Sequence, residues 1–449
     1  MGLSRSISDL LNNLDGEQAG LKMHQLMTEL YPLCRSITGD GVRQSLHIIC
    51  QHIPLKIQEV PTGTQVFDWE VPKEWNIRDA YVKNAAGKKV IDFQESSLHI
   101  VNYSVPVHKK VCLPELKNHL FSLPDHPDWI PYQKSYFNNT WGFCLQHRKL
   151  LDLEDGEYEV FIDTSLEPGH LTYGEYFIQG ESEDEILISC HCCHPSLCND
   201  NLSGMVVTAF LGKYLSSLPL RYSYRFLFIP STIGSVTWMA LNKNHLQKIK
   251  HGLVVACVGD PGHPTYKKSR SGRAEIDHAV EHILKYSEEP YTIFDFSPFG
   301  YDERQYSSPG INLPVGSLTR TSYGRFPEYH TSADNLDFVR SIYLADSLKK
   351  YIAVFDVLEN NQILFNCQPF GEPQLGKRGL SGAFGGSKDA KLIETALLWV
   401  LNFADGEHTL LDIAEKASLP FSIIKEAALA LIQVNLLREH AEKSNPMHT

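Results

Sequence analysis

One stretch of this chain, residues 191–204 with the sequence HCCHPSLCNDNLSG, places a histidine and an aspartate between a strand pattern and a helix pattern. The preceding EILISC (185–190) is apolar, as in a buried strand, and GMVVTAFLGKYL (204–215) has the apolar spacing of a packed helix. His191 then lies at the carboxyl end of a strand and Asp200 just before a helix, where ligand sites gather in open α/β sheets. An imidazole and a carboxylate together suit zinc or another borderline divalent ion.

Composition narrows the class of protein to which this pattern can belong. The 449 residues are enough for more than one domain, and 43% of them are hydrophobic, as a globular enzyme requires. The net charge of -12 provides no overall attraction for nucleic acid or for an anionic membrane. No apolar run reaches the length of a membrane span or of a signal-peptide core, so we expect a cytoplasmic protein with reduced cysteines and no membrane partner.

The pattern of helix-like, strand-like and glycine-rich stretches changes along the chain and predicts five segments. We expect residues 1–63 to begin an α/β domain, residues 64–162 to form an inserted β-rich domain, and residues 163–365 to complete the α/β domain with the metal site. A glycine-rich linker over 366–387 then leads to a helical unit over 388–449. The order of the predicted helices in that last unit resembles a winged helix-turn-helix.

The charge of the C-terminal unit argues against a nucleic-acid partner. Residues 388–449 carry 6 Lys+Arg against 9 Asp+Glu, which gives a formal charge of -3. A winged helix that reads DNA should present a basic face. We therefore expect this unit to contact protein, either a partner or a second copy of the chain.

Two further loops carry titratable side chains that can complete a site. The loop over 300–339 is rich in glycine and proline and holds His330, for which a solvated or core position is the more common interpretation on spacing alone. The loop over 258–273 follows a strand and begins with Asp260. This aspartate either meets His191 across the sheet or initiates a turn before Pro261.

The motifs that carry a family resemblance extend over nearly the whole chain. They are His191, Pro195, NDNLSG (199–204), IGS (233–235), YKKSRSGR (266–273), DERQY (302–306), PGINLPVGSLTRT (309–321) and PEYHTSADNLDFV (327–339). With these motifs the chain resembles the aminopeptidase-like proteins that are related to M28 zinc peptidases and associated with polysaccharide biosynthesis. The resemblance implies a zinc-peptidase-like mixed sheet with helices on both faces, an inserted β-rich domain and a C-terminal winged-helix-like domain.

The resemblance also implies roles for individual residues. His191 and His330 match the first and last metal histidines, and Asp200 matches the aspartate that bridges two zinc ions in M28 enzymes. These three ligands leave positions open for water and substrate. Where M28 enzymes have two adjacent glutamates, one the general base and the other a ligand, this chain has Ser231 and Thr232. We therefore expect one zinc ion rather than two, and Ser231 marks the loss of the usual base.

Other side chains are candidates for the roles that the missing glutamates leave open. Glu303, in the neighbouring loop, is the candidate for the proton transfer. Asp260 also stands near the position of an aspartate that M28 enzymes carry after a strand. The arginines suit a carboxylate or phosphate on the ligand, although surface ion pairs are an equal alternative. The candidate substrate-binding residues are Asp302, Arg304, Arg320, Asp260 and Tyr329.

The sequence thus predicts a metal-dependent, aminopeptidase-like hydrolase or biosynthetic tailoring enzyme that acts on an amide- or peptide-like small substrate. One alternative is a catalytically degenerate protein whose metal pocket binds a ligand while the inserted and C-terminal units make protein contacts. Another is a non-haem iron tailoring enzyme, because two histidines and one carboxylate also bind Fe2+.

Overall fold

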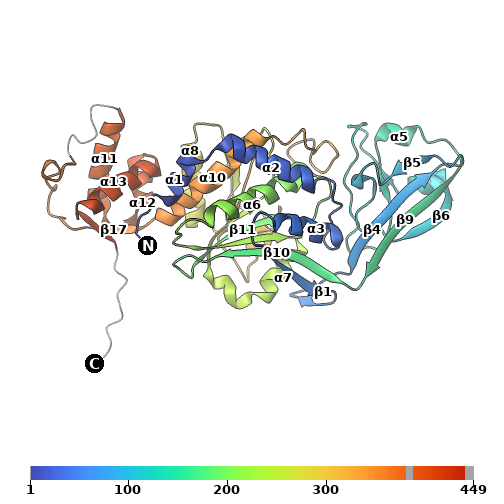
Figure 1. Ribbon diagram of the computed structural model, residues 1–449, viewed down its shortest axis with the longest axis horizontal. Helices are drawn as coiled ribbons and strands as arrows, with labels where there is room; N and C mark the ends of the chain where they lie inside the picture. Colours follow the sequence, from blue (N-terminus) through green and yellow to red (C-terminus); the bar gives the residue numbers. More distant parts are fainter. Residues whose placement is uncertain (1, 381–387, 440–449) are drawn as a thin grey trace, which may run out of the picture.

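The computed structural model of this chain describes residues 2–380 and 388–439. Figure 1 shows three parts in a row along the long axis: a central α/β domain, a β-rich domain at one end and a helical unit at the other. The predicted fold class, a mixed α/β sheet with an inserted β-rich domain and a C-terminal winged-helix-like domain, is confirmed. Parts of the predicted linker (381–387) and of the predicted C-terminal unit (440–449) lie outside the described residues.

A mixed sheet of eight strands forms the centre of the α/β domain, in the order β1-β10-β12-β11-β13-β16-β14-β15. Strand β11 pairs in parallel with β12 and β13, and β13 pairs in parallel with β16. The carboxyl ends of these four strands therefore meet at one edge of the sheet, and His191 is the last residue of β11. The strands are β1 (Lys56–Pro61), β10 (His170–Ile178), β11 (Glu185–His191), β12 (Ser223–Ile229), β13 (Ile249–Val255), β14 (Thr265–Lys267), β15 (Thr292–Phe294) and β16 (Val315–Thr319).

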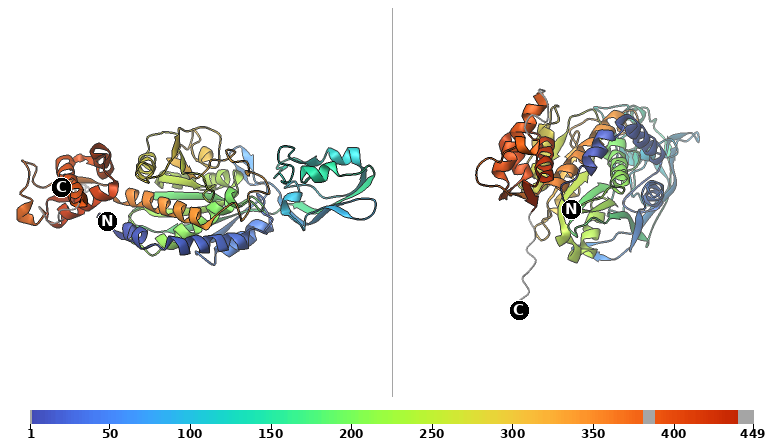
Figure 2. Two further views of the ribbon diagram at one scale, coloured as in Figure 1. Left: turned by 90° about the horizontal axis from the view of Figure 1, so that it is seen from above. Right: turned by 60° about the vertical axis from the view of Figure 1, so that its left-hand side comes forward.

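Helices cover both faces of this sheet. Along β12 the side chains alternate, so that Phe226 and Phe228 join a core with α2, α6 and α10, whereas Leu227 joins a second core with α7. Figure 2 shows α10 and the N-terminal helices together on one side of the sheet. The helices of the domain are α1 (Ser6–Asn13), α2 (Gly16–Leu30), α3 (Asp40–Ile49), α6 (Ser203–Leu215), α7 (Ile233–Leu241), α8 (Glu275–Lys285), α9 (Glu303–Tyr306) and α10 (Ser341–Asn360), with a 3-10 turn at Lys243–Lys248.

The inserted domain is built on an antiparallel sheet of four strands in the order β5-β4-β9-β6. Alternating burial along β4, with Trp75, Ala80 and Val82 buried, gives this domain a core on one face of the sheet. Its elements are β2 (Gln65–Val66), β3 (Trp69–Glu70), β4 (Glu74–Lys83), β5 (Lys89–Asp92), a 3-10 turn at Ser97–His99, β6 (Val107–Cys112), α4 (Leu113–Lys117), β7 (Leu120–Phe121), β8 (Phe143–Cys144), α5 (His147–Leu151) and β9 (Glu157–Glu167).

The C-terminal unit combines three helices with a three-stranded sheet in the order β18-β17-β19, as in a winged helix. Strand β17 comes before the predicted linker but pairs with both other strands, so this unit's sheet already begins at Ile363. None of the described helices has the length and apolar run that a membrane span needs. The elements are β17 (Ile363–Asn366), a 3-10 turn at Gly376–Arg378, α11 (Lys388–Phe403), β18 (Asp405–Thr409), α12 (Leu410–Ala417), α13 (Phe421–Gln433) and β19 (Leu437–Glu439).

Candidate metal centre

Three side chains from distant parts of the chain meet at the carboxyl edge of the central sheet. His191 ends β11, Asp200 lies in the turn Cys198–Leu202 that precedes α6, and His330 lies in the loop before α10. The Nε2 atom of His191 is 2.8 Å from Oδ1 of Asp200, and the Nε2 atom of His330 is 2.8 Å from Oδ2. The structure therefore brings together the three residues that the sequence analysis selects as metal ligands, with one carboxylate oxygen facing each imidazole.

A third histidine, His194, belongs to the same cluster and is absent from the sequence-based selection. Ligand atoms of His191, His194 and Asp200 all lie within 4.8 Å of one another. Burial holds the pKa of His194 well below its usual range, so the imidazole is neutral, which is the form that binds a metal ion. The sequence feature that could have identified His194 as a candidate is its position three residues after His191.

The carboxylate of Asp200 is buried, yet it stays ionised. Burial raises the pKa of this group, but the imidazoles of His194 and His191 and the hydrogen bonds to the histidines outweigh burial and hold the pKa well below its usual range. A carboxylate together with imidazoles is a donor set that suits zinc. The residues present thus fit a divalent metal ion on the chemistry of their donor atoms.

Asp334 fixes the backbone around this carboxylate. One oxygen of Asp334 accepts a hydrogen bond from the backbone N–H of Asn199 at 2.5 Å, and the other accepts one from the N–H of Asp200 at 3.0 Å. The side chain of Asn199 in turn donates to Oδ2 of Asp260 at 2.9 Å. The loops that carry Asp200 and His330 are therefore bound to each other beneath the candidate ligands.

The cysteines near the cluster pack as buried thiols. Cys190, Cys192, Cys193 and Cys198 are buried and free. Burial raises the pKa of the Cys193 thiol to about 12. These groups are protonated at neutral pH, so their chemistry in this environment is that of small apolar side chains.

Ser231 lies beside a buried carboxylate, that of Asp302. The hydroxyl of Ser231 donates to Oδ1 of Asp302 at 3.2 Å, and the hydroxyl of Ser235 donates to the same oxygen at 2.8 Å. The other oxygen, Oδ2, is buried without a hydrogen-bond partner among the described residues. Burial raises the pKa of Asp302 to about 6, although the nearby His191 opposes this shift.

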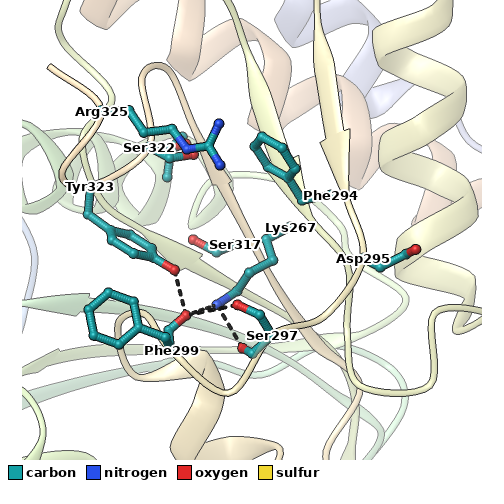
Figure 3. Close-up of a pocket in the computed structure, with 10 residues that line it drawn as sticks. Lys267, Phe294, Asp295, Ser297, Phe299, Ser317, Ser322, Tyr323 and Arg325 are labelled. Carbon is teal, nitrogen blue, oxygen red and sulfur yellow. Dashed lines mark hydrogen bonds between the residues drawn. The ribbon is translucent and has the colours of Figure 1, made fainter.

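Glu303 points elsewhere, toward Lys267 of β14, with which it forms a buried ion pair. Lys267 also donates to the carbonyl of Phe299 at 2.8 Å. Lys267, unlike Glu303, lines a cavity of about 370 Å3, which Figure 3 shows. This cavity is lined by Lys267, Phe294, Asp295, Ser297, Phe299, Ser317, Thr319, Ser322, Tyr323 and Arg325.

Aromatic rings connect this cavity with the metal cluster. The ring of Tyr323 packs against Tyr301 with centroids 5.1 Å apart, and Tyr301 stacks on His191 at 5.0 Å. The hydroxyl of Tyr301 also contacts the sulfur of Cys257 at 2.9 Å.

The candidate substrate-binding residues occupy different surroundings. The guanidinium of Arg320 is buried, donates to the carbonyl of Asp260 at 2.7 Å and forms an ion pair with Asp346 of α10. The carboxylate of Asp260 accepts hydrogen bonds from Asn199 and from the backbone of Thr321. Both side chains are thus committed to contacts within the protein.

Arg304 and Tyr329 lie in surroundings that differ from those of Arg320 and Asp260. The Nε atom of Arg304 is buried without a hydrogen-bond partner among the described residues. The ring of Tyr329 stacks on His330 with centroids 4.0 Å apart and an interplanar angle of 12°. Tyr329 therefore contacts a histidine of the cluster directly.

The inserted domain forms one wall of the site, which the sequence analysis did not predict. The ring of Tyr132 lies edge-on to His194 and to His330, with centroids 5.2 Å apart in each case. A second cavity of about 370 Å3 opens beside these rings. It is lined by Leu123, His126, Pro131, Tyr132, Gln133, Lys134, Pro327, Tyr329, His330 and Thr331.

Two protein families match this chain. Residues 24–361 match a family described as a domain of unknown function (DUF4910), and residues 362–439 match a winged helix-turn-helix family. A protein of Clostridium acetobutylicum, named a polysaccharide biosynthesis protein with aminopeptidase-like domain, is 54% identical over 424 residues, which cover 94% of this chain and 98% of that protein. The predicted resemblance and the predicted winged helix are thereby confirmed.

Solved structures agree with this assignment at the level of the fold. A crystal structure of a protein from Clostridium acetobutylicum, named as a peptidase, matches with a TM-score of 0.92 and 53% identity over 96% of this chain and 99% of that one. The zinc aminopeptidase BSAP from Bacillus subtilis matches with a TM-score of 0.56 and 12% identity, over 76% of this chain and 94% of its own. A peptidase M28 precursor from Shewanella amazonensis matches with a TM-score of 0.53 and 12% identity, over 78% of this chain and 96% of its own.

Proposed function

Because this chain belongs to the DUF4910 family and has an aminopeptidase-like α/β domain, we propose that it is a metal-dependent hydrolase of an amide- or peptide-like bond in a small substrate. The observation that carries the proposal is the cluster at the sheet edge, in which Asp200 contacts His191 through one oxygen and His330 through the other, with His194 close to His191 and Asp200. A tailoring step in the synthesis of a polysaccharide precursor is consistent with the name of the 54% identical relative.

The ligands would be His191, Asp200 and His330, and His194 has a ligand atom within 4.8 Å of those of His191 and Asp200. A divalent ion bound there would polarise a carbonyl and lower the pKa of a water molecule. Neither Ser231 nor its neighbour supplies a second carboxylate, which favours one zinc ion over two. The same donor set also suits Fe2+, so metal analysis of the purified protein is part of the test.

We infer that Asp302, rather than Glu303, takes the place of the missing base. Asp302 lies against Ser231, the position at which M28 enzymes are expected to carry a glutamate, and its Oδ2 is free to accept a proton. Glu303 is instead held by the ammonium of Lys267. Since the pKa of Asp302 is raised only to about 6, its carboxylate is ionised at neutral pH and remains basic enough to accept a proton.

The two serines that contact Asp302 have a positioning role in this proposal. Ser231 and Ser235 both donate to Oδ1 and thereby orient the carboxylate so that Oδ2 faces away from them. Shortening a glutamate at position 231 to serine leaves room beside Asp302, and the hydroxyl fills a hydrogen bond that a second carboxylate could not donate.

The experiment is hydrolysis of a panel of aminoacyl p-nitroanilides and dipeptides by the zinc-loaded full-length protein. Asp302→Asn should lower kcat by about 10²–10⁴-fold, which is the usual contribution of general acid–base catalysis, without loss of bound zinc. Glu303→Gln is the matched control and should retain kcat within a few fold. In the parent protein, kcat/KM should rise as pH increases through the pKa of Asp302, which is about 6 and is only lowered further by a bound cation. Asp302→Asn removes the titrating carboxylate, so this acid limb should disappear.

Other results would contradict the proposal in distinct ways. If Glu303→Gln loses kcat to the extent expected of Asp302→Asn, and Asp302→Asn retains it, the proton transfer belongs to Glu303. If the parent protein is inactive on the whole panel and Ser231→Glu gains activity, the natural protein is a degenerate enzyme that retains only the metal pocket.

A further inference from the structure

The inserted domain is bound firmly to the loop that carries His330. The backbone N–H of Tyr132 donates to the carbonyl of His330 at 2.8 Å, and the N–H of Ser332 donates to the carbonyl of Ile130 at 2.8 Å. Pro131 and Thr331 form an antiparallel bridge between these two hydrogen bonds. The segment 130–134 therefore has a fixed position relative to the metal cluster, and its side chains can act on a substrate bound there.

The cavity between this segment and His330 is lined by a basic residue and by no acidic one, although the protein as a whole is acidic. The chain as a whole has a net charge of -12, yet the residues that line this cavity include Lys134 and two histidines and no aspartate or glutamate. The other residues that line it are uncharged and include two aromatic rings, those of Tyr132 and Tyr329. The electrostatic environment of the cavity is therefore favourable for an anion.

The ammonium of Lys134 is available to bind that anion. Lys134 is exposed, and no carboxylate of the described residues lies within ion-pair distance of its Nζ, which instead lies 5.3 Å from the ring centroid of Tyr136. Lys267, which lines the cavity of Figure 3, differs from Lys134 because its ammonium forms an ion pair with Glu303.

Lys134 shares this cavity with a residue of the cluster. Lys134 and His330 both line the cavity, and His330 contacts Asp200. A ligand bound in the cavity can therefore contact Lys134 and the candidate metal ligands together.

On this geometry, and resting on the proposed function, we propose that Lys134 is a specificity residue that binds an acidic group of the substrate, a carboxylate or a phosphate, on the His330 side of the cleaved bond. The substrate class is then an acidic amide, such as an acylated amino acid or a phosphorylated, amide-bearing sugar. The inserted domain supplies this recognition, while the α/β domain supplies the metal ligands and Asp302.

Hydroxamates test the inference because their hydroxamate end binds zinc and the rest of the molecule can be varied. The probes are acetohydroxamic acid, the monohydroxamates of succinic, glutaric and adipic acid, and phosphonoacetohydroxamic acid, titrated calorimetrically into the zinc-loaded full-length protein at low and high salt. We expect at least one acidic probe to bind about tenfold more tightly than acetohydroxamic acid at low salt, and this preference to weaken with added salt. Comparison of the carboxylate and phosphonate probes identifies the preferred anion.

Substitutions assign the preference to Lys134. Lys134→Met should bring the acidic probes to parity with acetohydroxamic acid, and Lys134→Arg should retain most of the preference. The matched control is Lys88→Met. It removes the same charge from the hairpin between β4 (Glu74–Lys83) and β5 (Lys89–Asp92), which does not line the cavity. It should leave all affinities unchanged.

The outcomes separate this inference from the function on which it rests. If every probe binds the parent protein with equal affinity, or if Lys88→Met abolishes the preference as Lys134→Met does, Lys134 is not a recognition residue, although the metal centre stands. If acetohydroxamic acid and all acidic probes fail to bind the zinc-loaded protein, the proposed metal centre is wrong and this inference falls with it.

Discussion

At the scale of single residues, the site is organised around one carboxylate. Asp200 presents one oxygen to His191 and the other to His330, and His194 completes the set at a short distance. Because burial keeps His194 neutral and its neighbours keep Asp200 ionised, these two groups are in the forms that bind a cation.

The contribution of His194 can be measured directly. His194→Ala should weaken zinc binding by about 10–100-fold if this imidazole is a ligand or supports one. Competition with a chromophoric chelator gives the affinity, and circular dichroism verifies the fold. His126→Ala, which changes a histidine of the adjacent cavity outside the cluster, is the control. Unchanged zinc affinity in His194→Ala would remove this residue from the metal centre.

At the scale of elements, the strand ends and their loops hold the site in place. His330 adopts a φ of 57°, in the left-handed region that non-glycine residues rarely occupy, and its carbonyl accepts the hydrogen bond from Tyr132. The loops before α6 and before α10 are joined by the carboxylate of Asp334. The rigid strands thus hold the loops that carry the site residues, as is usual for sites at the carboxyl edge of a sheet.

A buried histidine in one strand of this sheet should make the free energy of unfolding depend on pH in acid. His251 in β13 is 4% exposed, both ring nitrogens lack hydrogen-bond partners among the described residues, and burial lowers its pKa to about 3. Between pH 6.5 and about 3 the unfolded chain binds a proton at this histidine and the folded chain does not, so the free energy of unfolding falls as pH falls through that window. One such group contributes a slope of about 1.4 kcal/mol per pH unit.

Substitution of His251 should remove that slope. His251→Phe, which approximately preserves volume, should lose less stability than the parent between pH 7 and pH 5, as measured by urea denaturation at each pH. The exposed His263→Phe serves as the control and should keep the parental dependence. A parental slope in His251→Phe would show that other groups determine the acid sensitivity.

At the scale of the whole molecule, one buried ion pair connects the α/β domain to the winged helix. Lys425 of α13 is 1% exposed and lies 2.6 Å from Asp356 of α10. Lys425 also contacts Ser8 of α1, so the N-terminal helix is part of the same junction. Contacts of the inserted and C-terminal units with a protein partner or a second copy remain a prediction.

Breaking this pair should loosen the junction. Lys425→Met leaves the carboxylate of Asp356 buried without its partner, which typically costs about 3–5 kcal/mol. Differential scanning calorimetry and limited proteolysis should show a lower transition and earlier release of the C-terminal unit. Arg5→Met breaks an exposed pair with Glu426 at the same junction and should cost no more than about 1 kcal/mol. Equal effects of the two changes would argue against a special role for the buried pair.

The family motifs in the sequence were sufficient to predict the fold class and three side chains that the structure brings together at the sheet edge. The strand pattern of 185–190 and the helix pattern of 204–215 place His191 and Asp200 at a sheet edge, because period and burial are local properties of the chain. His330, Ser231 and the departure from the M28 pattern came from the resemblance and not from spacing. His194 was within reach of the same reasoning but was not selected.

The remaining features of the site depend on contacts between residues far apart in the sequence. The partnering of Asp302 with Ser231, of Glu303 with Lys267, and of Tyr132 and Lys134 with the cluster requires the relative placement of strands and of the inserted domain. Neighbours in a sequence, such as Asp302 and Glu303, point in different directions once helix α9 and its surroundings are packed. The sequence by itself determined which chemical groups are available and on which kind of element they lie, because propensity and periodicity are local. Only the tertiary structure decided which groups share a pocket, because burial and long-range packing set their partners and their charges.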